Sequence, residues 1–132
     1  MLREILEEVQ NESFMSKINN WFKNLEIVQM IRQDKLQDEY QTTTKVLPKS
    51  MDKIKEDNGW TFYNVKTLDK QDYLCFISTN DAHLVKKFMS EIKRYNFSDG
   101  DYWLSLGKIP SMEQNGVTPF YIHELSIDRS KI

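Results

Sequence analysis

Apolar residues recur every three or four positions along the first part of the chain, which is the spacing of one face of a helix. The repeat runs from Leu2 to Val9 and, after a short polar stretch, from Phe14 to Val28. It predicts an N-terminal helical segment over residues 1–37. The pattern leaves open whether this segment is one kinked helix or two.

Beyond residue 38 the pattern changes to the two-residue alternation and the β-branched composition of strands. The predicted strands cover residues 40–47, 60–67, 72–78, 102–106 and 118–127. Pro48 is expected to end the first strand, and Ser50 to begin a short helical turn that carries Met51 and Ile54. A second helix is predicted over residues 81–96, where Asp81 precedes an apolar face with helical spacing.

The element order is therefore α-β-α-β-β-α-β-β, which predicts an α+β fold with a mostly antiparallel sheet of about five strands. We expect a single domain over residues 1–132, divided into the helical segment 1–37 and a sheet with a helix over 38–132. The strand segment 73–77 is apolar at every position. A strand of this kind is covered on both faces, here either by two helical layers or by a second chain.

Composition and charge narrow the function classes. The chain has 132 residues with 18 basic and 20 acidic side chains, a formal charge of -2, so a dedicated nucleic-acid binder is not indicated. Its single cysteine, Cys75, lies in an apolar run and is expected to be a buried thiol in a reducing, cytoplasmic compartment.

No apolar stretch reaches the roughly 18 residues of a membrane span. The high content of Lys, Asn and Ile is typical of a low-GC bacterium or a phage.

The search for catalytic motifs gives no candidate. His83 lies in the first turn of the predicted helix, and His123 and Glu124 are neighbours on the last predicted strand, where they are expected to point to opposite faces. On that alternation His123 shares a face with Tyr121 and Leu125. No zinc spacing, phosphate-binding loop or nucleophile motif occurs. The sequence therefore predicts no catalytic residue, no metal site and no cofactor, and leaves an enzyme only as an alternative.

A basic face on the second predicted helix is more suggestive. Lys86 and Lys93 are seven residues apart, as are Lys87 and Arg94, so each pair repeats on the polar side of the helix. Such a face can bind phosphate groups or an acidic partner. Its simpler interpretation is a solvated helix surface.

Aromatic residues make up 12% of the chain, and strand alternation cannot bury all of them. If Tyr102 and Leu104 face the core, Trp103 faces outward together with Ser105, and Tyr63 is expected to face outward on another strand. Outward Trp and Tyr are typical of binding hot spots. Coverage by a helix or by the loop over residues 107–117 is the alternative.

Together these features favour a non-enzymatic protein-binding module: an inhibitor, an immunity protein or antitoxin, a chaperone-like protein, or a phage protein that acts on a host target. The expected partner is another protein contacted through Trp103, Tyr63 and Ser105, and a homodimer stays open. The alternatives are nucleic-acid or phospholigand binding through helix 81–96, and a small enzyme with an unrecognised site.

Overall fold

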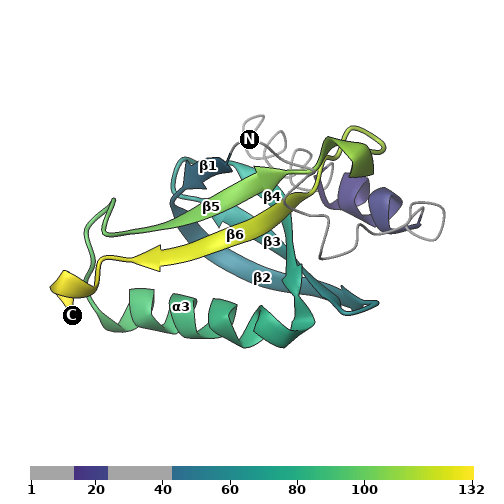
Figure 1. The fold of residues 1–132 in the computed structure, drawn as a ribbon. Helices are drawn as coiled ribbons and strands as arrows, with labels where there is room; N and C mark the ends of the chain where they lie inside the picture. The colour runs from purple at the N-terminus through teal and green to yellow at the C-terminus, as the bar shows by residue number, and fades with distance from the viewer. Residues whose placement is uncertain (1–13, 24–42) are drawn as a thin grey trace, which may run out of the picture.

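The computed structural model of the protein describes residues 14–23 and 43–132. Residues 14–23 are helical, and the other predicted positions of the segment 1–37 lie outside the described residues. The strands and the second helix follow in the order β1 (Thr43–Val46), β2 (Pro48–Asp57), β3 (Trp60–Thr67), β4 (Asp72–Ser78), α3 (Ala82–Arg94), β5 (Tyr102–Lys108) and β6 (Phe120–Ile127) (Figure 1). Short 3-10 turns cover Thr79–Asp81, Pro110–Met112 and Arg129–Lys131.

The strands form one six-stranded mixed sheet in the order β1-β5-β6-β4-β3-β2. Strands β4 and β6 pair in parallel, and every other pair of neighbours is antiparallel. The fold is therefore α+β, as the sequence predicts, but with six strands in place of about five. Among the described residues, no helix is long and apolar enough to cross a membrane.

The additional strand arises where the sequence predicted a helical turn at residues 51–54, and that prediction is wrong. Pro48 begins β2 instead of ending a β-region, a position that proline tolerates because β2 is an edge strand. Strand β2 then runs to Asp57 and turns tightly into β3. The turn residues Asn58 and Gly59 have φ values of 50° and 84°, as a two-residue hairpin turn requires.

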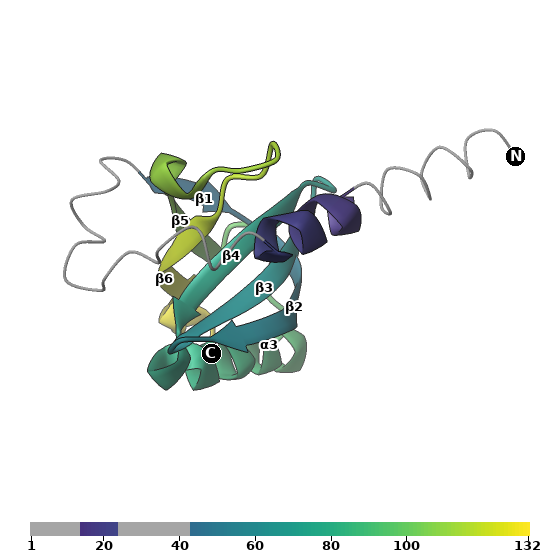
Figure 2. The ribbon, with the colours of Figure 1, turned by 90° about the vertical axis from the view of Figure 1, so that its right-hand side faces the viewer.

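The sheet is covered on both faces. Helix 14–23 and α3 lie on opposite sides of it (Figure 2). On the side of helix 14–23 lies the first core, which contains Ile18, Trp21, Trp60, Phe62, Leu74, Phe76, Ile109, Met112 and Val117. On the side of α3 lies the second core, which contains Tyr63, Val65, Cys75, Ile77, Val85, Phe88, Tyr102, Leu104, Leu106 and Ile122. The residues of β4 alternate between the two cores, which confirms that this apolar strand is covered twice.

Candidate binding grooves beside helix α3

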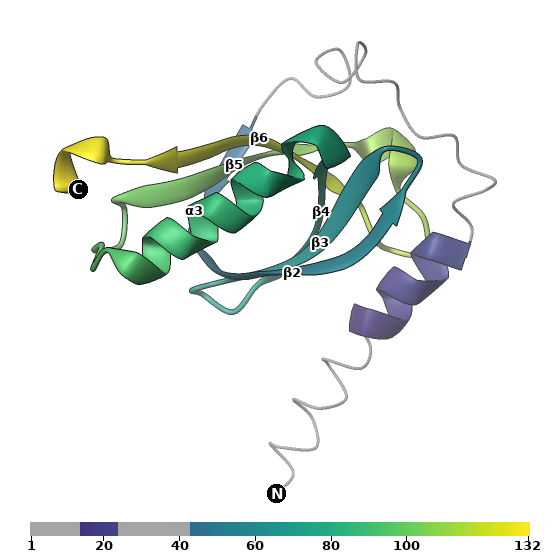
Figure 3. The same ribbon diagram turned by 90° about the horizontal axis from the view of Figure 1, so that it is seen from below.

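Helix α3 lies along the sheet with β6 on one side and β2 on the other (Figure 3). Val85 and Phe88 anchor it in the second core. A groove follows each flank of the helix, one bounded by β2 and β3 and the other bounded by β6. We call them the basic groove and the β6 groove.

The basic groove has a volume of about 620 Å³, within the range of small-molecule sites. Lys86 and Lys93 reach it from α3, and Lys53 reaches it from β2. Glu56 is its only carboxylate, so three ammonium groups and one carboxylate give it a charge of +2 with His83 neutral. Its apolar wall consists of Met51, Val85 and Met89.

The predicted basic face of the helix is divided by the fold. Lys86 and Lys93 both line the basic groove, but Lys87 lines the β6 groove on the other flank. Arg94 places its guanidinium carbon 5.5 Å from the centroid of the Tyr95 ring. The four cations therefore do not form one continuous surface.

Tyr63 also lines the basic groove, directly across β2 and β3 from Lys53. Only 5% of it is exposed, so the expectation that Tyr63 faces outward is wrong, because α3 covers that face of β3. Burial, with a smaller contribution from the charge of Glu56, raises the pKa of the Tyr63 hydroxyl. The hydroxyl is thus protonated at neutral pH and can donate a hydrogen bond.

Lys53 and Glu56 form an ion pair with their Nζ and Oε1 atoms 2.5 Å apart. About half of each side chain is exposed, so the pair adds little to the stability of the fold. A ligand carboxylate can therefore compete with Glu56 for Lys53 at little cost.

Trp103 and Ser105 lie on the other face of the sheet, because their neighbours Tyr102 and Leu104 belong to the second core. Ser105 is 3% exposed, so the expectation that it faces solvent is wrong. Trp103 is half-buried, and Lys45 on β1 places its Nζ atom 5.0 Å from the ring centroid. The three residues predicted for one partner surface are thus separated: Tyr63 lies at the basic groove, and the other two lie across the sheet.

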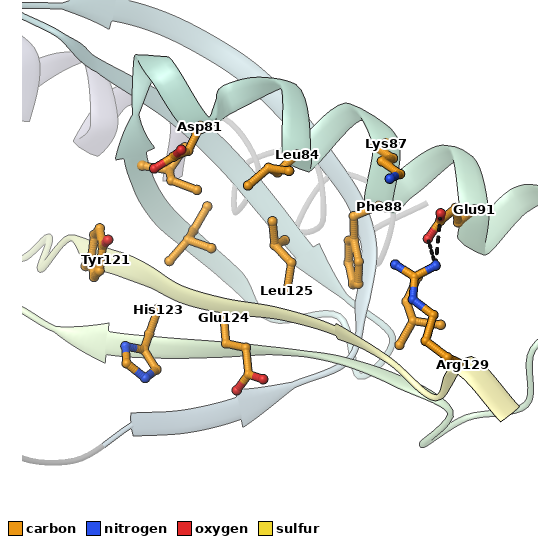
Figure 4. A pocket seen from close by; sticks show the side chains of 13 residues that line it. Asp81, Leu84, Lys87, Phe88, Glu91, Tyr121, His123, Glu124, Leu125 and Arg129 are labelled. Atoms are coloured by element: carbon orange, nitrogen blue, oxygen red, sulfur yellow. Dashed lines mark hydrogen bonds and ion pairs between the residues drawn. The ribbon is translucent and has the colours of Figure 1, made fainter.

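The β6 groove has a volume of about 340 Å³ and lies between β6 and the flank of α3 that carries Leu84, Lys87 and Glu91 (Figure 4). Arg129 and Glu91 close one end of it with an ion pair of 3.1 Å. Leu84, on the helix side, is 41% exposed and is among the few large apolar side chains of residues 14–23 and 43–132 that are this exposed.

A β-bulge in strand β6 changes the direction of its side chains. Ser105 pairs with Glu124, whereas Leu106 pairs with Ile122, so His123 is an extra residue in β6. His123 and Glu124 consequently both point away from α3, and Leu125 points toward it (Figure 4). The predictions that His123 and Glu124 point to opposite faces, and that His123 shares a face with Leu125, are therefore wrong.

Neither groove has the arrangement of a metal centre. Within residues 14–23 and 43–132, no group of three or more His, Cys, Asp or Glu side chains is placed to hold a metal ion. Asp101, one of the acidic residues beside Gly100, accepts a hydrogen bond of 2.9 Å from the backbone N–H of Ser98 and so supports the turn before β5.

Comparison of the chain with protein-family models, curated proteins and solved structures finds no match.

Proposed function

We propose that the protein is a non-catalytic binding module whose basic groove takes an acidic, amphipathic segment of a partner protein. The observation that supports this function is the convergence of Lys53, Lys86 and Lys93 with Tyr63 at one groove. Three different elements supply these side chains. The sequence alone placed Lys86 and Lys93 in one candidate surface and Tyr63 in another, and it did not single out Lys53.

Charge supports an acidic ligand. The chain as a whole has a formal charge of -2, but the basic groove has a charge of +2. A local potential opposite in sign to that of the molecule guides an acidic segment to the groove and disfavours other orientations.

The apolar wall supports a peptide segment over an isolated phosphate. Met51 from β2 and Met89 from α3 line the same groove as the three lysines. Methionine side chains adapt to the shape of apolar ligands, and lysine stems add apolar surface beneath their charged ends. A segment with acidic groups on one face and apolar side chains on the other matches both kinds of lining residue.

The distribution of the cations argues against a nucleic acid as the first choice. A phosphate backbone is bound by a stripe of cations along one surface. Lys87 lies on the other flank of α3, so the helix does not present such a stripe. Nucleic-acid binding is therefore the alternative that the same experiment examines.

The test uses fluorescence anisotropy with a labelled short peptide that has glutamates on one face and leucines on the other. Binding should weaken as salt rises, and the combination Lys86→Glu with Lys93→Glu should weaken it at least about tenfold. The matched control, Lys87→Glu with Arg94→Glu, makes the same charge change on the same helix and should change the affinity less than about twofold.

Two results would contradict the proposal. Equal effects of the two double variants would show that only the overall charge matters. Tighter binding of a single-stranded oligonucleotide than of the peptide, with the same dependence on Lys86 and Lys93, would favour the nucleic-acid alternative. A peptide with glutamine in place of glutamate separates the apolar contribution from the charged one.

A further inference from the structure

The first thirteen residues of the chain are an acidic, amphipathic segment, and they lie outside the described residues. Four carboxylates and one guanidinium, that of Arg3, give their side chains a charge of -3. The carboxylates are those of Glu4, Glu7, Glu8 and Glu12. The apolar residues have the spacing of a helix face and are Leu2, Ile5, Leu6 and Val9. The chain itself therefore carries a segment of the chemistry that the basic groove is proposed to take.

The acidic side chains of this segment match the spacing of the lysines on α3. In the helix that the apolar spacing predicts, Glu4, Glu8 and Glu12 form one row, whose ends are about 12 Å apart along the axis. Lys86 and Lys93 repeat after seven residues of α3, which is about 10.5 Å along its axis. A helix beside α3 can therefore bring carboxylates to both ammonium groups while its apolar stripe faces the apolar wall of the groove.

The cations of the basic groove are accessible to such a segment. Lys53, Lys86 and Lys93 are all exposed. Lys86 and Lys93 form no ion pair with another residue of 14–23 or 43–132, and the ion pair of Lys53 with Glu56 is itself exposed. The charge of +2 in the groove is opposite in sign to the charge of -3 on the segment. Complementary charges of this kind favour association and fix its orientation.

The point where the segment joins the fold favours a second molecule as its source. Phe14 packs against the first core, and the helix that it begins lies across the sheet from α3 (Figure 2). The apolar spacing ends at Val9, so four residues remain before Phe14, and they span at most about 14 Å. Layers on opposite faces of a sheet are about 20 Å apart, twice one packing distance of about 10 Å. The segment is therefore too closely tethered to enter the groove of its own chain.

We propose that residues 1–13 of a second copy of this chain occupy the basic groove, an inference that rests on the proposed function of that groove. When each molecule gives its segment to the other, the contact is made twice and the assembly closes as a two-fold dimer. The acidic segment of any other partner must then displace residues 1–13 before it binds. Dimerisation thus regulates access to the groove.

Analytical ultracentrifugation of the full chain over a range of concentrations tests the dimer. The wild-type protein should dimerise, and its dissociation constant should rise with salt. The segment variant, Glu8→Lys with Glu12→Lys, and the groove variant, Lys86→Glu with Lys93→Glu, should each dimerise at least about tenfold more weakly. An equimolar mixture of the two variants should restore the dimer, because each segment then meets a groove of opposite charge.

The matched control is Glu113→Lys with Glu124→Lys, which makes the charge change of the segment variant at exposed positions outside the basic groove. Its dissociation constant should lie within about twofold of the wild-type value. The proposal is overturned if the wild-type protein stays monomeric, if the mixture of the two variants stays monomeric, or if the control weakens the dimer as much as the segment variant does.

Binding of the peptide with glutamates and leucines separates this proposal from the proposed function. In anisotropy, the segment variant should bind that peptide at least about threefold more tightly than the control variant does, because its own segment no longer competes for the groove. Equal binding by the two variants, in a protein that does not dimerise, would leave the proposed function standing and overturn only the occupant proposed here. Failure of the peptide to bind even the segment variant would instead contradict the proposed function.

Discussion

The indole N–H of Trp21 donates a hydrogen bond of 2.8 Å to the backbone carbonyl oxygen of Met112, across 91 positions of the chain. Gln114 adds a second connection, because its Nε2 atom donates to the backbone carbonyl oxygen of Trp21 at 3.2 Å. The connection between β5 and β6 therefore holds helix 14–23 in place and closes the first core. Coverage of strand aromatic residues by this loop is the alternative that the sequence leaves open beside a partner surface.

Replacing Trp21 with Phe should lower the free energy of unfolding by about 1–3 kcal/mol, because the buried carbonyl of Met112 loses its donor. Urea denaturation measures this change. Met15→Leu on the exposed side of the same helix is the control and should change stability by less than about 0.5 kcal/mol. A Trp21→Phe protein as stable as the control would show that this hydrogen bond makes no net contribution to the free energy of unfolding.

The bulge in β6 makes a prediction opposite to that of simple alternation. Counting by twos from the buried Ile122 assigns Glu124 to the core side, but the structure assigns Leu125 to it. Leu125→Lys should therefore reduce the free energy of unfolding by about 1–3 kcal/mol. Glu124→Lys should change it by less than about 0.5 kcal/mol. If thermal or urea unfolding shows that Glu124→Lys destabilises the protein more than Leu125→Lys does, the bulge is not at His123.

Cys75 should be inert in the native protein. It lies on β4, fully buried in the second core, and burial raises the pKa of its thiol, so almost no thiolate is present or accessible. Reaction with Ellman's reagent should follow the unfolded fraction as urea is added, with one thiol released per chain. Rapid stoichiometric reaction without urea would contradict the burial of this strand.

The ionisation of Tyr63 should link stability to alkaline pH. Its pKa is raised in the folded state, so the unfolded chain releases this proton first as pH rises above the ordinary tyrosine value of about 10. The stabilisation is thus complete below that pH and is lost as pH rises through the folded pKa. Tyr63→Phe should make the alkaline loss of stability less steep in urea denaturation measured across this range.

Glu56→Gln tests the second cause of that shift. The substitution removes the carboxylate charge near Tyr63 but leaves the ring buried. The pKa of the Tyr63 hydroxyl, followed by ultraviolet titration, should decrease. It should still lie above the ordinary tyrosine value, because burial is the larger cause of the raised pKa. A titration unchanged by Glu56→Gln would mean that the charge of Glu56 does not reach the hydroxyl.

Several elements could be predicted from local sequence alone. The hairpin of β3 and β4 follows from two β-rich runs separated by a polar turn, and α3 follows from its apolar spacing. The Asn58-Gly59 turn follows from residues that accept positive φ values. In each case the determining interactions connect residues close together in the chain. The turn predicted at residues 51–54 failed because pairing with β3 outweighed a weak local preference.

The candidate sites were decided by tertiary structure. The sequence determined that Lys86 and Lys93 share one row of a helix, but only the placement of α3 brought that row to Lys53 and Tyr63. It likewise could not place the extra residue His123, because a bulge is defined by the register of the partner strand. Helical and strand periods are local properties of the backbone. Which face becomes covered, and which residue is extra in a strand, depends on elements that meet only when the whole sheet assembles.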